Sequence, residues 1–138
     1  IDLVYVIEAI AHCEMNTTQQ ARQKLLRVKN SASIPANLAW ANIYTREHSV
    51  EDAITSCKAM QDLAKRKLLK IDEKKQTASE RLSQGLDDAD KDLCSKILNV
   101  ETDYLRQLAN IPLENVEEKE LYEFLSIGIQ VLLSIVPG

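Results

Sequence analysis

The chain has 138 residues, of which 45% are hydrophobic and 28% are charged, and its net charge at pH 7 is −4. This length suits one domain with a hydrophobic core, and the composition is too apolar for a disordered chain. The negative net charge argues against a general nucleic-acid-binding protein, whose surface is basic. Helix-forming residues dominate and only three glycines and three prolines interrupt them, so the sequence predicts an all-α fold.

The cysteines indicate the compartment. Cys13, Cys57 and Cys94 are far apart and odd in number, whereas a secreted disulfide framework uses an even set. We therefore expect free, buried thiols and an intracellular, cytoplasmic location. The chain begins with Ile-Asp-Leu-Val-Tyr and lacks an initiator methionine, which suggests a fragment of a larger protein. The most apolar stretch, 121–136, is too short and too polar to span a membrane.

The first half of the chain predicts short helices joined by turns. Apolar residues at helical spacing place these helices at about 2–15, 17–29 and 35–47. Thr17 or Thr18 can cap the second helix, and Pro35 suits the first turn of the third. Ser49, followed three residues later by Asp52, marks the start of a fourth helix.

The fourth helix is predicted to be much longer than the others. From Val50 to Gly85 the helical spacing continues without proline, and the apolar residues follow a period close to 3.5. Gln61 and Lys75 interrupt that apolar stripe. Such a helix extends over about 50 Å. It must therefore project from the domain or pack against an equally long partner.

A two-helix part is expected after the long helix. Asp88 or Asp90 can cap a helix that ends near Asn110, and a last helix covers about 114–136. The last helix starts acidic, which suits a helix N-terminus, and it ends almost wholly apolar. Its apolar end has three interpretations: burial at the centre of a bundle, a surface for self-association or another subunit, or shallow membrane insertion.

Residues 1–66 contain an internal echo with an offset of 32 residues. Ala9 and Ala41 stand at equivalent positions, as do Ala21 and Ala53. Small residues at these places let neighbouring helices approach closely, as in helix–turn–helix repeats. We therefore expect these four alanines to face other helices.

The echo resembles two degenerate tetratricopeptide units. The second unit matches better, with Trp40-Ala41-Asn42-Ile43-Tyr44 on one helix and Glu51-Asp52-Ala53-Ile54 opening the next. The first unit departs from the pattern at Glu8 and His12. The resemblance implies antiparallel helix pairs, a groove for a peptide or helix, and a scaffold role. A helical bundle without repeats is the alternative.

The residues that could carry chemistry do not form a site by sequence. In the His-Cys-Glu run at 12–14, successive side chains on a helix point in different directions and cannot converge on one ion. The Asp-x-Asp-x-Asp run at 88–92 is followed by Leu93 and Asn99 where a calcium loop needs glycine and a carboxylate. No phosphate-binding or nucleophile motif occurs. We expect no catalytic residues, no metal and no cofactor, and hence no enzyme.

The favoured function is a non-enzymatic protein–protein interaction or scaffold domain of a larger intracellular assembly. It occupies 1–138 as one all-helical domain, with repeat-like hairpins over 1–66 and a long-helix bundle over 67–138. The alternative is a membrane-surface targeting bundle that uses the basic part of the long helix and the apolar last helix. Nucleic acid is not an expected partner, because the basic stretch lacks aromatic residues for stacking. The candidate partner-binding residues are Trp40, Tyr44, Lys65, Arg66, Lys67 and Lys70.

Overall fold

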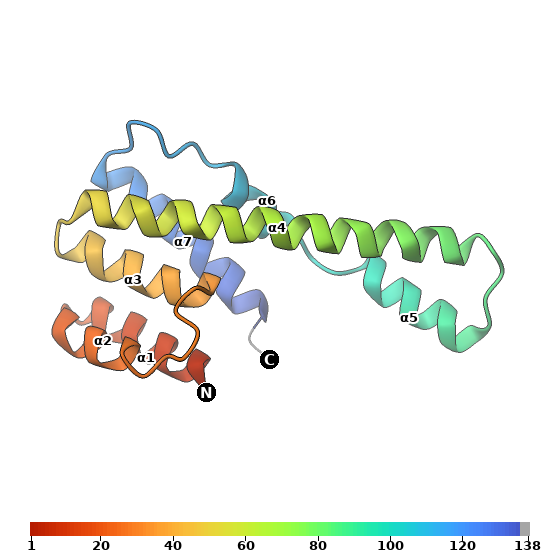
Figure 1. Ribbon diagram of the computed structural model, residues 1–138, viewed down its shortest axis with the longest axis horizontal. Coiled ribbons are helices and arrows are strands. Elements are labelled where there is room, and N and C mark those ends of the chain that lie inside the picture. Colours follow the sequence, from red (N-terminus) through yellow and green to blue (C-terminus); the bar gives the residue numbers. More distant parts are fainter. Residues whose placement is uncertain (136–138) are drawn as a thin grey trace.

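The computed structural model describes residues 1–135 and confirms the all-α fold (Figure 1). Within that range the chain forms seven helices and no strand. The helices are α1 (Asp2–Glu14), α2 (Thr18–Leu25), α3 (Ile34–Arg46), α4 (Val50–Leu82), α5 (Asp88–Leu98), α6 (Asp103–Asn110) and α7 (Glu118–Ile135).

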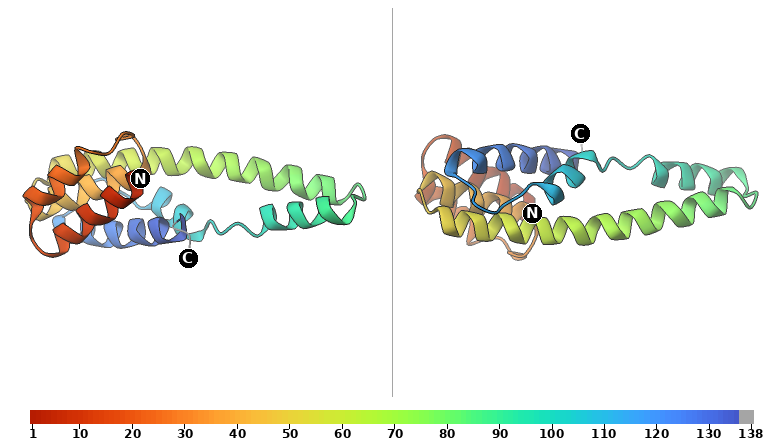
Figure 2. Two further views of the ribbon diagram at one scale, coloured as in Figure 1. Left: turned by 90° about the horizontal axis from the view of Figure 1, so that it is seen from below. Right: turned by 90° about the horizontal axis from the view of Figure 1, so that it is seen from above.

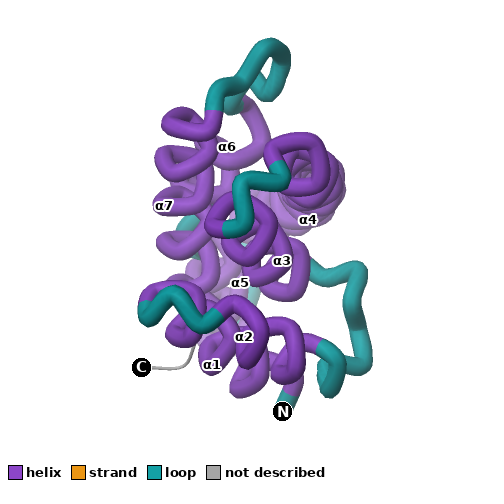
Figure 3. Tube along the Cα trace, turned by 90° about the vertical axis from the view of Figure 1, so that its left-hand side faces the viewer, coloured by secondary structure: helices purple, strands orange, loops and turns teal. Residues whose placement is uncertain are grey.

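The helices divide into a body and an arm. In the body, α3 lies between the α1–α2 pair and a layer that contains α4 and α7 (Figure 3). Helix α4 has 33 residues and extends well beyond the body, where its far half runs alongside α5 (Figures 1 and 2). The arm, defined as residues 73–98, is therefore a two-helix hairpin that projects from the body. The expected long fourth helix is present, and within residues 1–135 its far end has one helix beside it, α5.

Small residues let the body helices pack closely. Ala9, Ala21, Ala41 and Ala53 are all fully buried, as the internal echo predicts. Gly128 plays the same role on α7. A β-carbon at this glycine would lie 2.7 Å from Cδ1 of Leu38 on α3 and 3.1 Å from Cε of Met60 on α4, so both side chains pack directly against the α7 backbone.

The helix expected over 88–110 is two helices in the structure. Helix α5 already runs back toward the body, and an extended segment between Leu98 and Asp103 then leads the chain from the arm to α6 (Figure 2). The N-cap of α5 is Asp87 and not Asp88 or Asp90 as expected, and its carboxylate accepts the amide of Asp90 at 2.9 Å. The last helix begins at Glu118 instead of 114, and its predicted end at 136 lies outside the described residues.

The two polar residues that interrupt the apolar stripe of α4 bind the two ends of the α6 region. The buried Gln61 amide donates to the carbonyl oxygens of Leu108 at 3.1 Å and Ile111 at 2.5 Å, at the end of α6. Lys75 Nζ donates to the carbonyl oxygen of Val100 at 2.7 Å, between α5 and α6. Both residues bind backbone carbonyls that no helix satisfies. The interruptions in the stripe therefore mark where α4 binds connecting segments.

Helix α7 buries one of its faces and leaves apolar side chains exposed on the other. It buries Leu121, Phe124 and Leu132, whereas Tyr122 and Leu133 are exposed on its other side. Its packing partners are α3, α4 and α6. In the part of the chain that the structure covers, no helix combines the length and the apolar character needed to cross a membrane.

Candidate functional site

Three adjoining hollows follow one flank of α4 and form a continuous concave surface beside the predicted basic residues. Their volumes are about 340, 450 and 210 Å³, in order along the helix. The first two share Leu63 and Arg66, and the last two share Lys67 and Val131. We call this continuous surface the α4 groove. Its lining residues are Ser31, Ala32, Ser33, Ile34, Pro35, Asn37, Ala59, Asp62, Leu63, Arg66, Lys67, Lys70, Ile71, Val100, Glu101, Tyr104, Leu105, Val131 and Ser134.

One wall of the α4 groove comes from α4 and the other from three separate segments. Positions three and four apart on a helix share a face, so Ala59, Leu63, Lys67 and Lys70 line the same flank of α4. The opposite wall combines the segment before and at the start of α3, the start of α6, and the end of α7. Because a helix rises about 1.5 Å per residue, the groove extends over about 18 Å of α4. That length matches about three turns of a bound helix.

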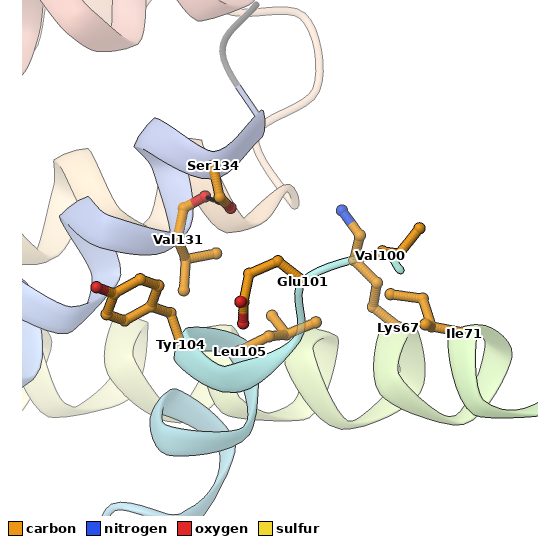
Figure 4. Close-up of a pocket in the computed structure, with 8 residues that line it drawn as sticks. All are labelled: Lys67, Ile71, Val100, Glu101, Tyr104, Leu105, Val131 and Ser134. Carbon is orange, nitrogen blue, oxygen red and sulfur yellow. Dashed lines mark hydrogen bonds between the residues drawn. The ribbon is translucent and has the colours of Figure 1, made fainter. Parts of the chain in front are cut away.

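Figure 4 shows the third hollow. Val131 and Ser134 of α7 lie on one side, Lys67 and Ile71 of α4 lie on the other, and Leu105 lies between them. The lining is mostly apolar, but the Glu101 carboxylate lies between Val131 and Leu105, and the Lys67 ammonium group extends from the α4 side. This combination can bury an apolar side chain while polar groups contact the neighbouring backbone or charge.

The cations gather at the middle hollow, which is the largest of the three. Arg66, Lys67 and Lys70 line it, and no carboxylate does. All three are exposed, and none has an ion-pair partner within 4.0 Å among residues 1–135. Asp62 and Glu101 lie at the two ends of the groove. The middle of the groove therefore presents unpaired positive charge beside the apolar side chains of Leu63 and Val131.

The structure separates Lys65 from the other predicted cations. Lys65 lies on the opposite flank of α4, where it lines a hollow with Lys58, Gln61 and the segment that connects α6 to α7. The predicted basic set is therefore divided, with Arg66, Lys67 and Lys70 in the α4 groove and Lys65 outside it.

Trp40 and Tyr44 lie outside the α4 groove and are half-buried. Their rings stack with centroids 5.6 Å apart and an interplanar angle of 24°. The Arg22 guanidinium of α2 covers both rings, at 5.6 and 5.7 Å from their centroids. This arrangement joins α2 to α3 through stacking and cation–π contact. The predicted anchors are thus largely engaged within the fold.

An ion pair completes this aromatic cluster. Arg22 donates to both carboxylate oxygens of Glu47, with Nε 3.3 Å from Oε2. Hydrogen bonding from Arg22 lowers the pKa of Glu47 below its ordinary value, and the same contact raises the pKa of Arg22. The cluster therefore fixes α2 against the end of α3.

The buried thiols are unsuited to nucleophilic chemistry. Burial raises the pKa of Cys13 to about 11 and the pKa of Cys57 to about 12. Both side chains therefore stay protonated at neutral pH, and a thiolate is the reactive form. His12 is engaged with Thr17, its Nδ1 lying 3.0 Å from Oγ1. Over the described part of the chain, no group of three or more His, Cys, Asp or Glu side chains could hold a metal ion.

Sequence reasoning missed the apolar half of the α4 groove. Ile34, Pro35, Val131 and Tyr104 come from segments far apart in the chain, and nothing local in the sequence marks them as neighbours. Leu63 could have been identified, because it precedes Lys67 and Lys70 at helical spacing on one face. Comparisons with protein-family models, curated proteins and solved structures found no match to this chain.

Proposed function

We propose that the chain is a non-enzymatic protein–protein interaction domain that binds a partner segment in the α4 groove. One observation carries the proposal: three unpaired cations stand beside apolar side chains in a surface about three helical turns long. Binding grooves for amphipathic helices combine an apolar floor with charged edges. A scaffold or adaptor role in a larger assembly follows from such a site.

The chemistry of the groove indicates which segments it fits. Leu63, Ile71 and Val131 can bury apolar side chains that recur every three to four residues in the partner. Arg66, Lys67 and Lys70 favour carboxylates at the middle of that segment, since opposite charges raise the association rate and suppress wrong partners. We expect an amphipathic segment with acidic residues flanked by apolar ones.

The test is a selection for binders followed by mapping. A display library of 12-residue peptides is selected against the folded chain, and the bound peptides are located by NMR shift changes. We expect enrichment of acidic, apolar peptides and shifts centred on the groove residues. Failure to select any binder, or shifts confined to other surfaces, contradicts the proposal.

A matched pair of variants sharpens this test. Lys67→Glu/Lys70→Glu reverses two charges in the α4 groove, whereas Lys58→Glu/Lys65→Glu makes the same change on the opposite flank of the same helix. We expect the first variant to weaken peptide binding about tenfold or more and the second to change it little. Equal effects from both variants mean that overall charge, and not the groove, governs binding.

A further inference from the structure

Helix α1 carries an apolar face that no helix within residues 1–135 covers. Val4, Ile7, Ala11 and Met15 recur at intervals of three and four, so they form one stripe along the helix. Val4, Ile7 and Met15 are 54%, 44% and 61% exposed, and Ala11 is exposed as well. Ile1, which is 94% exposed, extends the stripe at its start. We call these five residues the α1 stripe.

The internal echo shows what the same face does elsewhere in this chain. The 32-residue offset places three of the five stripe residues at positions that are fully buried in α3, whereas Ile1 and Met15 correspond to Ser33 and Glu47, which are partly exposed. It joins Val4 with Ala36, Ile7 with Ala39, and Ala11 with Ile43. On α3, Leu38 points at Gly128 of α7, and the buried positions 36 and 43 lie on the opposite side of the helix.

Helix α3 packs against the α1–α2 pair as well as against α4 and α7 (Figure 3), so its fully buried positions lie within interfaces between helices. The equivalent face of α1 carries small and apolar side chains like those of α3, but no helix within residues 1–135 covers it. The other end of the stack differs, because α7 packs against both α3 and α4 there. A second copy thus cannot stack head-to-tail on the α3–α4 pair, so two copies that meet through this face place one α1 stripe against the other.

The surroundings of the α1 stripe are electrically neutral, although the whole chain carries a net charge of −4. Glu8 pairs with Lys24 at 2.7 Å, and Glu14 pairs with Arg46 at 3.2 Å. The Asp2 carboxylate accepts two backbone amides, each at 3.0 Å. Asp2 keeps its charge but lies on the opposite side of α1 from the stripe, so the two carboxylates that flank the stripe, Glu8 and Glu14, are both ion-paired within the chain. Two copies can approach at this face without like-charge repulsion, and an uncharged apolar face matches another of the same kind.

We propose that the chain forms a two-fold dimer through the α1 stripe. When two such helices pack antiparallel, Ile7 of each copy lies next to Ile7 of the other. Ala11 then faces Val4, and Met15 faces Ile1, so small side chains oppose larger ones. An interface built from one patch on both copies closes on itself and does not extend into fibres. The proposal is independent of the partner-binding role, because no residue of α1 lines the α4 groove.

Sedimentation velocity of the full chain tests the dimer, over concentrations from about one to several hundred micromolar, the range suited to a small interface. We expect the sedimentation coefficient to rise with concentration. Val4→Glu places a charge in the stripe of each copy, and we expect it to weaken dimerisation at least about tenfold. Leu93→Glu is the matched control, since Leu93 is 56% exposed on α5 and lies in the arm.

Several results overturn the dimer. The dimer is contradicted if the wild-type chain stays monomeric throughout this range. It is also contradicted if Val4→Glu and Leu93→Glu change the association equally. A second measurement does not depend on the stability of either variant. Under mild oxidation, we expect Ile7→Cys to form a disulfide between two copies, because position 7 of one copy lies next to position 7 of the other. The native cysteines Cys13, Cys57 and Cys94 are buried and do not compete. If the chain that carries Ile7→Cys as its sole substitution does not form this disulfide, the two-fold geometry is contradicted.

Discussion

The body and the arm are built from the same kind of helices, yet they bury very different amounts of apolar surface. Helix α3 packs against α1, α2, α4 and α7, whereas α5 packs against α4 alone. The buried side chains of the arm are Ala78 and Cys94, each 3% exposed, and both are small. In the body, buried side chains include Phe124, Leu38 and Met60.

This difference indicates what stabilises each part. Most helical stability in proteins comes from packing an apolar face, and short helices with little packing depend on capping and propensity. We therefore expect the body to unfold as the main cooperative unit, and the arm to open locally at a lower free energy. The following predictions compare the two parts, beginning with the largest expected effect.

Truncating a large side chain in the body has the largest effect. Phe124 is fully buried on α7, so we expect Phe124→Ala to lower the free energy of unfolding by about 3–5 kcal/mol. Leu93 is exposed on the arm, and we expect Leu93→Ala to change the free energy of unfolding by less than about 0.5 kcal/mol. Urea unfolding followed by circular dichroism measures both. Similar losses from both variants contradict a core confined to the body.

The two polar residues on the apolar stripe of α4 give the second comparison. Gln61→Ala leaves two carbonyl oxygens near the end of α6 without their buried donor, so we expect a loss of about 1–3 kcal/mol. Lys75→Ala removes an exposed contact to Val100 that water can replace, so we expect less than about 1 kcal/mol. Thermal unfolding of the two variants measures the difference. An equal loss of stability at the two sites counts against the stronger role of Gln61.

Two helix caps provide a chemically matched comparison. The Ser33 hydroxyl accepts the amide of Ala36 in the body, and the Asp87 carboxylate accepts the amide of Asp90 in the arm. Replacing either with alanine costs about 1 kcal/mol. We expect Ser33→Ala to lower the global free energy of unfolding, whereas Asp87→Ala accelerates hydrogen exchange of α5 amides only. If Asp87→Ala also accelerates exchange in α3, the arm and the body unfold together.

The smallest effect concerns pH and the Arg22–Glu47 pair of the body. The pKa of Glu47 in the folded state is below its ordinary value of 4.5, because Arg22 hydrogen-bonds its carboxylate. The stabilisation is therefore fully present above about pH 4.5 and is lost as pH falls through the lower folded-state pKa. The pair is partly exposed, so its contribution is about 1 kcal/mol or less.

Measuring unfolding of wild type and Glu47→Gln from pH 7 to pH 3 checks this linkage. We expect the wild-type chain to be the more stable at neutral pH and the difference to shrink in acid. The control Glu123→Gln removes an exposed carboxylate of α7. A wild-type advantage that persists unchanged at the acid end is incompatible with the ion pair as its source.

Local periodicity was sufficient to predict the all-α fold and the long helix of this chain. It also identified the four buried alanines, because a helix needs small residues wherever another backbone comes close. The break between α5 and α6 was not predictable, since apolar spacing continues through Val100 and no glycine or proline intervenes. The bond from Lys75 to Val100 is a contact across 25 positions in the chain, which a local pattern does not contain.

The sequence by itself also determined that the middle of α4 is basic. Only the tertiary structure decided which of those charges act together, because the helix turns Lys65 to one flank and Lys67 and Lys70 to the other. It likewise decided that Trp40 and Tyr44 are covered by Arg22, and that Ile34 and Val131 complete the α4 groove. The tetratricopeptide resemblance stays a prediction. Helical spacing places residues on faces, whereas the packing of distant segments determines which faces remain open.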